Sequence, residues 1–143
     1  MEFNMYKRIM VAIDNSETAE KALLEAVEIA QLHHSALCLV HVVGDSEDDD
    51  EQEGVELLER AKATVNEGLR VETRLMTVNA VYGMHGIAEA IAKATSEWGA
   101  GLLVMGTANR RGLERFVVGS VTEYIITKVE ASILLVRPRF LFL

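Results

Sequence analysis

Short continuous apolar runs alternate with segments of helical periodicity along this chain, and this alternation constrains its fold more than any other feature. Five runs are too short for helices and are rich in apolar strand-forming residues; they span residues 9–13, 36–43, 71–78, 102–105 and 133–136. Most are continuous rather than alternating in polarity, which is typical of strands buried on both faces. Strands that alternate with helices predict a parallel sheet with right-handed crossovers and helices on both sides.

Four segments between these runs have the spacing of helices. The first follows the turn at 14–16, and its apolar face is expected to consist of Ala19, Ala22, Leu23, Ala26 and Ala30. The second is expected to end near Gly68, with an apolar face of Val55, Leu58, Ala61, Val65 and Leu69. The third and fourth are expected over 85–98 and 120–129. We therefore predict a single α/β domain over residues 1–143, a three-layer doubly wound five-stranded parallel sheet with about four helices, and the more polar third strand near an edge.

Acidic residues are concentrated in one stretch. The formal net charge is −8, and seven of the 22 Asp and Glu residues lie within residues 45–53, so that the rest of the chain is almost neutral. We interpret this stretch as a solvated acidic loop, because it lacks the spacing and the glycine of a calcium-binding loop. Since no basic stripe with interleaved aromatic residues is present, no nucleic-acid partner is expected.

The termini and the single cysteine indicate the cellular compartment in which the protein is expected. Residues 1–5 lack the features of a signal peptide, and we exclude them from the fold because a leader or an expression tag could begin this way. No apolar run approaches the ~20 residues that cross a bilayer, and no membrane association is expected. Cys38 alone can form neither an internal disulfide nor a cysteine cage for a metal. We expect a cytoplasmic protein whose apolar tail, 138–143, packs on its own domain or on a partner subunit.

The segment after the fourth strand is unusually long. It runs 13 residues from Gly106 to Val118, where α/β connections commonly take ~2–6. Gly106 allows backbone amides to approach an anion closely, and Gly119-Ser120 would open a helix whose free N–H groups favour a phosphate. Ser120 and Glu123 also match a capping box, a structural role that is compatible with this one. The Arg110 guanidinium is either a phosphate ligand or ordinary solvated surface.

Three segments of the chain match a known pattern together. They are residues 9–17, residues 39–42, and the long loop with the 119–123 segment that follows it. On these segments the chain, from about 6 to 137, resembles the universal stress protein domains. Nucleotide-binding members carry a glycine, two residues, a second glycine, nine residues, and then glycine with serine or threonine. Gly106 and Gly119-Ser120 match this spacing, whereas Asn109 stands in place of the second glycine.

The resemblance implies an adenine nucleotide alpha hydrolase-like fold with strand order 3-2-1-4-5, and a site for ATP with Mg²⁺ but no metal held by the protein. Asp14 matches an aspartate that faces the ribose or adenine, and a helix cap is the structural alternative for it. Val42 matches a position whose backbone contacts the adenine edge. The nucleotide-binding residues that the resemblance implies are Ala12, Asp14, Val42, Met105, Gly106, Asn109, Arg110, Gly119, Ser120 and Val121.

The same resemblance implies a homodimer. The fifth strand corresponds to the edge that pairs across the dimer in this family, and its apolar residues are Ile133, Leu134, Leu135 and Val136. An exposed apolar edge is otherwise a liability for unwanted pairing. Self-association is therefore expected.

The absence of several known motifs excludes some classes of function for this chain. The chain has neither a Gly-x-x-x-x-Gly-Lys-Ser/Thr phosphate loop nor a Gly-x-Gly-x-x-Gly dinucleotide turn, and its histidines lack partners at metal-ligand spacing. No catalytic residue is predicted, and hydrolysis should be slow or nil. The prediction is an ATP-binding stress-response regulatory protein in which the nucleotide acts as a conformational signal. The alternative is a dimeric interaction module that binds no nucleotide, favoured by the space that the Asn109 side chain takes from a phosphate.

Overall fold

Five parallel strands form one sheet within residues 5–47, 50–65, 67–107 and 120–138, the ranges that the computed structural model describes. The strands are β1 (Arg8–Ala12), β2 (Ala36–Gly44), β3 (Val71–Val78), β4 (Leu102–Gly106) and β5 (Ser132–Val136). Their order is β3-β2-β1-β4-β5, and all neighbouring pairs are parallel. The predicted fold class and strand order are confirmed. The tail beyond Pro138 lies outside the described residues.

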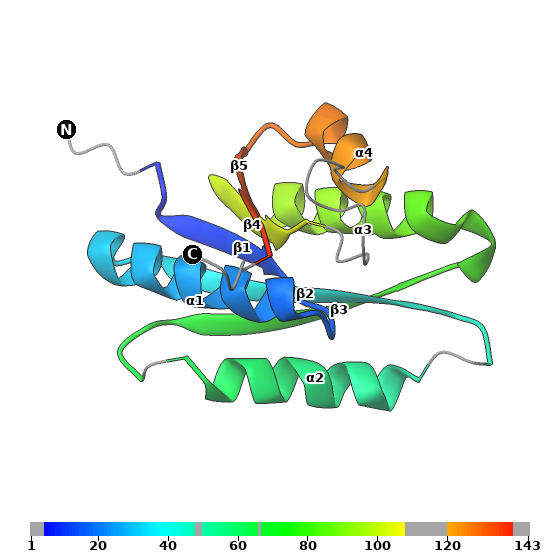
Figure 1. Cartoon of the computed structure of the whole chain (residues 1–143), viewed down its shortest axis with the longest axis horizontal. Helices are drawn as coiled ribbons and strands as arrows, with labels where there is room; N and C mark the ends of the chain where they lie inside the picture. Colours follow the sequence, from blue (N-terminus) through cyan, green and yellow to red (C-terminus); the bar gives the residue numbers. More distant parts are fainter. Residues whose placement is uncertain (1–4, 48–49, 66, 108–119, 139–143) are drawn as a thin grey trace.

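Helices cover both faces of this sheet. They are α1 (Glu17–His33), α2 (Glu51–Ala63), the short 3₁₀ helix η1 (Ala80–Tyr82), α3 (Gly83–Trp98) and α4 (Ser120–Lys128). Figure 1 shows α1 and α2 on one side of the strands and α3 and α4 on the other. Successive residues of a strand point to opposite faces, so Ile9 and Val11 of β1 pack on the α1 side, and Met10 and Ala12 pack on the α3 side. The three predicted layers are confirmed.

The predicted apolar face of α1 is correct. Its buried residues include all five predicted positions, namely Ala19, Ala22, Leu23, Ala26 and Ala30. Four of the five are alanines, which let the helix axis approach the sheet closely. The helix begins after Ser16, whose hydroxyl accepts a hydrogen bond from the Ala19 amide at 3.1 Å.

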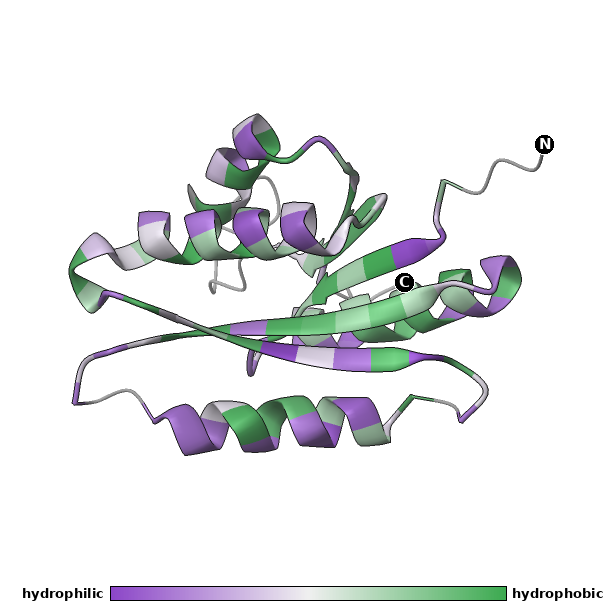
Figure 2. Cartoon of the chain, turned by 180° about the vertical axis from the view of Figure 1, so that it is seen from behind, coloured by the Kyte–Doolittle hydropathy of each residue, from purple (hydrophilic) through white to green (hydrophobic). Residues whose placement is uncertain are grey.

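The second helix differs from its prediction. It starts earlier, at Glu51, and ends at Ala63, so Val65 and Leu69 lie beyond it. Leu58 is 3% exposed whereas Val55 is 40% exposed, and therefore only one of these two faces the core. In Figure 2 much of this outer helix is coloured as hydrophilic.

The acidic stretch at 45–53 is also not one solvated loop. Asp50 is the N-cap of α2 and accepts hydrogen bonds from the amides of Gln52 and Glu53, at 2.8 and 3.3 Å. Glu51 and Glu53 belong to the first helical turn. Carboxylates at a helix N-terminus satisfy free amides and oppose the positive end of the helix dipole. Part of the charge cluster therefore starts a helix, a role that charge density alone did not indicate.

Replacing Asp50 with alanine should destabilise the protein modestly. The loss of a carboxylate N-cap costs ~1 kcal/mol, which corresponds to a fall in Tm of about 3 °C. Thermal unfolding followed by circular dichroism measures the effect. Glu47→Ala removes the same charge from an exposed residue before the helix, and an equal loss in that variant would refute the capping role.

The sheet has two edges, β3 and β5. Along β3 no residue is fully buried, and Figure 2 shows hydrophilic segments on this strand beside the apolar β2. The prediction that the third strand lies at an edge is confirmed. In the part of the chain that the structure describes, every helix is too short or too polar to cross a membrane.

Cys38 is predicted to be chemically inert in the folded protein. It is fully buried in β2, and burial, with a smaller contribution from the Glu72 carboxylate, raises the pKa of its thiol to about 11. Because the thiolate is the reactive form, iodoacetamide at pH 8 should modify Cys38 only when a denaturant unfolds the chain. Mass spectrometry measures this, and rapid modification of the native protein would contradict it.

Candidate functional site

A cavity of about 240 Å³ opens at the carboxyl ends of β1, β2 and β4. The chain winds from β1 toward β2 and β3, and then returns to place β4 and β5 on the other side of β1. Ligands of open α/β sheets bind beyond the carboxyl ends of the strands at this reversal. The cavity therefore lies where the topology favours a ligand.

Six of the ten sequence-predicted site residues line this one cavity. They are Ala12, Asp14, Val42, Met105, Gly106 and Val121. Ser120 is the first residue of α4, and its side chain is not among those described. Asn109, Arg110 and Gly119 lie outside the described residues. The structure thus brings together residues from four separate elements or their ends.

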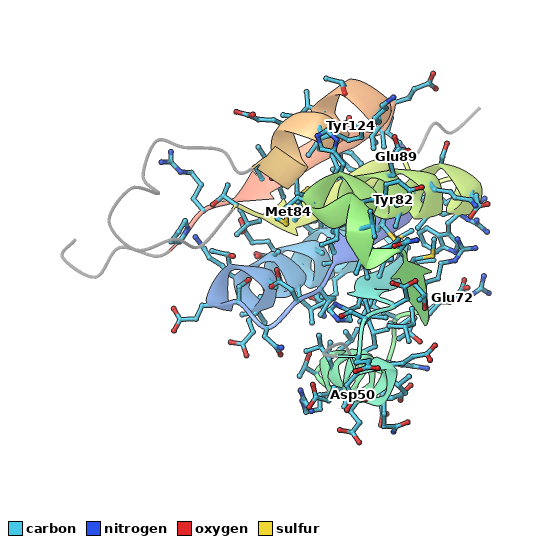
Figure 3. All side chains as sticks on the ribbon, turned by 90° about the vertical axis from the view of Figure 1, so that its right-hand side faces the viewer. Asp50, Glu72, Tyr82, Met84, Glu89 and Tyr124 are labelled. Carbon is cyan, nitrogen blue, oxygen red and sulfur yellow. The ribbon has the colours of Figure 1, made fainter. Side chains whose placement is uncertain are left out.

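One end of the cavity is apolar. Val42 and Met105 contribute from the sheet, and Ile87 and Ile91 contribute from α3. Met84, at the start of α3 (Figure 3), also lines the cavity and remains 47% exposed. The sequence analysis did not select Ile87 or Ile91 for the site, since helical periodicity cannot distinguish a core wall from a cavity wall. This end can hold an apolar or aromatic group.

Asp14 supplies a carboxylate at the rim of the same cavity. Its Oδ1 accepts hydrogen bonds from the backbone amide of Ser16, at 2.8 Å, and from the Ser16 hydroxyl. Ser16, not Asp14, is the N-cap of α1, so the alternative that Asp14 caps the helix is wrong. A carboxylate has about four acceptor positions. Asp14 therefore retains capacity to accept hydroxyl donors from a ligand.

Position 106 requires a glycine for a packing reason that the sequence did not reveal. A Cβ atom at this position would lie 2.5 Å from Thr18 Oγ1, 2.6 Å from Thr18 Cβ and 2.9 Å from the Thr18 carbonyl carbon. Thr18 is buried in the first turn of α1, and its hydroxyl donates to the carbonyl oxygen of Thr107 at 3.2 Å. The glycine thus permits α1 to contact the end of β4, in addition to any role in admitting an anion.

Sequence reasoning did not select Thr107. This residue follows β4 directly, is 8% exposed and lines the cavity together with Val121 and Thr122 of α4. The first turn of a helix carries the positive end of its dipole, so this part of the cavity favours an anionic group. The sequence signal that could have identified Thr107 is a polar residue at the carboxyl end of an interior strand.

His41 was also missed as a cavity residue. Its Nδ1 lies 2.7 Å from the carbonyl oxygen of Ile13, the residue before Asp14. With Nδ1 as the donor, this bond holds the end of β1 against β2. Among the described residues no group of three or more histidine, cysteine or acidic side chains could hold a metal ion.

Helix α4 is fastened to α3 beside the cavity. The Tyr124 hydroxyl donates to Glu89 Oε1 across the two helices (Figure 3), and the Tyr124 ring stacks on His85 at 4.7 Å between centroids. The hydrogen bond to the carboxylate raises the pKa of Tyr124. These contacts hold the start of α4 close to the cavity without placing the tyrosine in it.

Comparison with known proteins agrees with this fold. The model of the universal stress protein family matches residues 5–137. A putative universal stress protein of Staphylococcus haemolyticus is 33% identical over 141 residues, which covers 92% of this chain and 85% of the relative. A solved structure from the same family in Burkholderia pseudomallei is 31% identical, with a TM-score of 0.72 and coverage of 94% and 98%.

A second solved structure is the universal stress protein of Archaeoglobus fulgidus in complex with dAMP. It is 26% identical, has a TM-score of 0.72, and covers 92% of this chain and 98% of its own. The family match spans most of the chain and includes every strand and helix described above. This chain therefore belongs to the universal stress protein family.

Proposed function

We propose that this protein binds an adenine nucleotide, ATP with Mg²⁺, in the cavity at the carboxyl ends of β1, β2 and β4. The observation that carries the proposal is the convergence of Asp14, Val42, Gly106 and Val121 on one cavity at the reversal of the winding. The bound nucleotide would act in the cytoplasm as a conformational signal in a stress response.

The lining of the cavity offers the three kinds of group that a nucleotide requires. Its apolar end, with Val42, Met105 and Ile87, suits an adenine ring. The Asp14 carboxylate can accept hydrogen bonds from ribose hydroxyls. The start of α4 carries the positive end of a helix dipole, which favours a phosphate. The related Archaeoglobus fulgidus structure in complex with dAMP supports the same class of ligand.

Little or no hydrolysis is proposed. In the described part of the chain no carboxylate cluster offers a protein-held Mg²⁺ site, so Mg²⁺ would be carried by the phosphates of the ligand. Asp14, the carboxylate in the cavity, is assigned to the ribose hydroxyls and not to the activation of a water. The proposal is therefore a binding and regulatory protein rather than an enzyme.

Two measurements test nucleotide binding. Native mass spectrometry of the purified protein should detect a co-purified adenine nucleotide, and titration with a fluorescent ATP analogue should saturate. If neither detects binding, the alternative of an interaction module that binds no nucleotide is favoured. Asn109→Gly then separates the two hypotheses further, because affinity that appears only in this variant would show that Asn109 blocks the natural site.

We also propose self-association through β5, independently of nucleotide. In the described sheet β5 pairs only with β4, which leaves its other edge open. Ile133, Leu134 and Leu135 are only half-buried there. A parallel or antiparallel pair of such edges would satisfy the exposed backbone groups. Sedimentation analysis at micromolar concentrations should show a dimer, and a monomer at all concentrations would refute this proposal.

A further inference from the structure

Thr107 Oγ1 is the one buried side-chain nitrogen or oxygen that lacks a hydrogen-bond partner in the described part of the chain. The residue is only 8% exposed, its hydroxyl oxygen is buried, and Thr107 is one of the residues that line the cavity. Leaving a buried hydroxyl without a partner is unfavourable. A buried polar group without a hydrogen-bond partner in a native protein requires a specific explanation. A contact with a ligand is one such explanation.

The backbone of Thr107 is fixed on both sides. Its amide donates to the carbonyl oxygen of Val136 at 2.9 Å, which ties it to β5. Its carbonyl oxygen accepts from the Thr18 hydroxyl of α1 at 3.2 Å. The main chain therefore has its partners, and the side-chain hydroxyl is the group left over. A group held in this way is preorganised for a ligand.

Two features of the surroundings identify the chemistry of the missing partner. Val121 and Thr122, in the first turn of α4, line the same cavity, and the amides of a first helical turn favour a negative charge. A hydroxyl that donates to an anionic oxygen forms a charge-assisted hydrogen bond, which is stronger than a neutral one. A phosphate oxygen satisfies both Thr107 and the helix terminus.

A short path of polar contacts joins Thr107 to Asp14. The Thr18 hydroxyl that donates to Thr107 lies 3.1 Å from Ser16 Oγ, and Ser16 Oγ donates to Asp14 Oδ1. In a nucleotide whose ribose is held at Asp14, the first phosphate is the one attached directly to that ribose.

We infer that Thr107 Oγ1 donates a hydrogen bond to the first phosphate of the bound nucleotide, so that a nucleoside 5′-monophosphate is the smallest ligand that satisfies the site. This inference rests on the proposed function and deepens it. It assigns to Thr107 the discrimination between a nucleotide and the corresponding nucleoside. Further phosphates would lie beyond its reach.

The test compares the affinities of AMP and adenosine by isothermal titration calorimetry. Thr107→Val keeps the shape of the side chain and removes the hydroxyl, and it should reduce the preference for AMP over adenosine about tenfold. Adenosine itself should bind with unchanged affinity, whereas AMP, ADP and ATP should each weaken by the same factor. Thr107→Ser keeps the hydroxyl and should restore the preference. Equal weakening of AMP and adenosine in the valine variant would overturn the inference.

Thermal unfolding without ligand gives an independent readout. Because Thr107→Val removes an unsatisfied group, its Tm should be equal to or higher than that of the parent. Thr95→Val is the matched control, since the Thr95 hydroxyl is buried and donates to the Ile91 carbonyl oxygen at 2.7 Å. That control should lose stability without any change in the AMP preference. A lower Tm for Thr107→Val would reveal a structural partner and contradict the inference.

Failure of the inference differs from failure of the proposed function. If the parent protein binds AMP and ATP but Thr107→Val retains the full AMP preference, only the role of Thr107 is refuted. If the parent protein binds neither adenosine nor any of its phosphates, both proposals are refuted together.

Discussion

Gly106→Ala should lower the free energy of unfolding by about 3 kcal/mol, at the upper end of the ~1–3 kcal/mol typical of overpacking. The new methyl group would meet the Oγ1, Cβ and carbonyl carbon of Thr18 at 2.5, 2.6 and 2.9 Å. A side chain alone could rotate away, but the contact with the Thr18 main chain requires α1 to move off the end of β4. Chemical denaturation followed by circular dichroism measures the loss, and the Tm should fall by about 10 °C.

The design of this experiment separates a packing clash from a general effect of losing a glycine. Gly68→Ala is the matched control, because a Cβ atom at Gly68 meets nothing within 4 Å. That variant should be as stable as the parent or slightly more stable, since alanine reduces the freedom of the unfolded chain. Thr18→Ala should rescue Gly106→Ala only in part, because the Cβ and main-chain contacts remain. Unchanged stability of Gly106→Ala would show that α1 does not approach β4 this closely.

Asp14→Ala should weaken the binding of ATP at least tenfold, with little change in stability. Hydrogen bonds to a charged group contribute ~1.5–3 kcal/mol, and each 1.4 kcal/mol is a factor of ten in affinity. Ser16, rather than Asp14, caps α1, so the helix should keep its start in this variant. Equilibrium titration with a fluorescent ATP analogue measures the change.

Asp50→Ala is the matched control for Asp14→Ala. It removes the same charge and is expected to cost the cap of α2, but Figure 3 places Asp50 at α2, well apart from Met84 at the cavity. The two variants should therefore have opposite effects. Asp14→Ala should lose affinity for ATP and keep its stability, whereas Asp50→Ala should lose stability and keep its affinity for ATP. Equal affinities in the two variants would place the ligand elsewhere.

The local sequence was sufficient for most of the fold. Continuous apolar runs predicted the strands, and the spacing of Ala19, Ala22 and Ala26 predicted the buried face of α1. These patterns are informative because the period of burial differs between a strand and a helix. The strand order came from the family resemblance and is confirmed. The resemblance also selected six residues that the structure collects around one cavity.

Local pattern was less reliable where several local signals compete. The acidic stretch was interpreted as a loop, yet Asp50 and the residues after it begin a helix. Asp14 and Ser16 both suit a helix cap, and the geometry of the turn assigned that role to Ser16. Val55 and Leu58 lie three residues apart and both are apolar, but only the second reaches the sheet.

By itself the sequence determined the alternation of strands and helices, the three layers and the end of the sheet at which a site should form. The tertiary structure alone decided why Gly106 tolerates no side chain and why the Thr107 hydroxyl has no partner. Thr18 leaves no room for a side chain at Gly106 and donates to the carbonyl oxygen of Thr107, which is 89 positions away along the chain. Periodicity records only which face of an element is buried. The hydrogen bond from Thr18 to Thr107 at 3.2 Å and the lack of room for a Cβ atom at Gly106 depend on how closely α1 approaches the end of β4 when the chain folds.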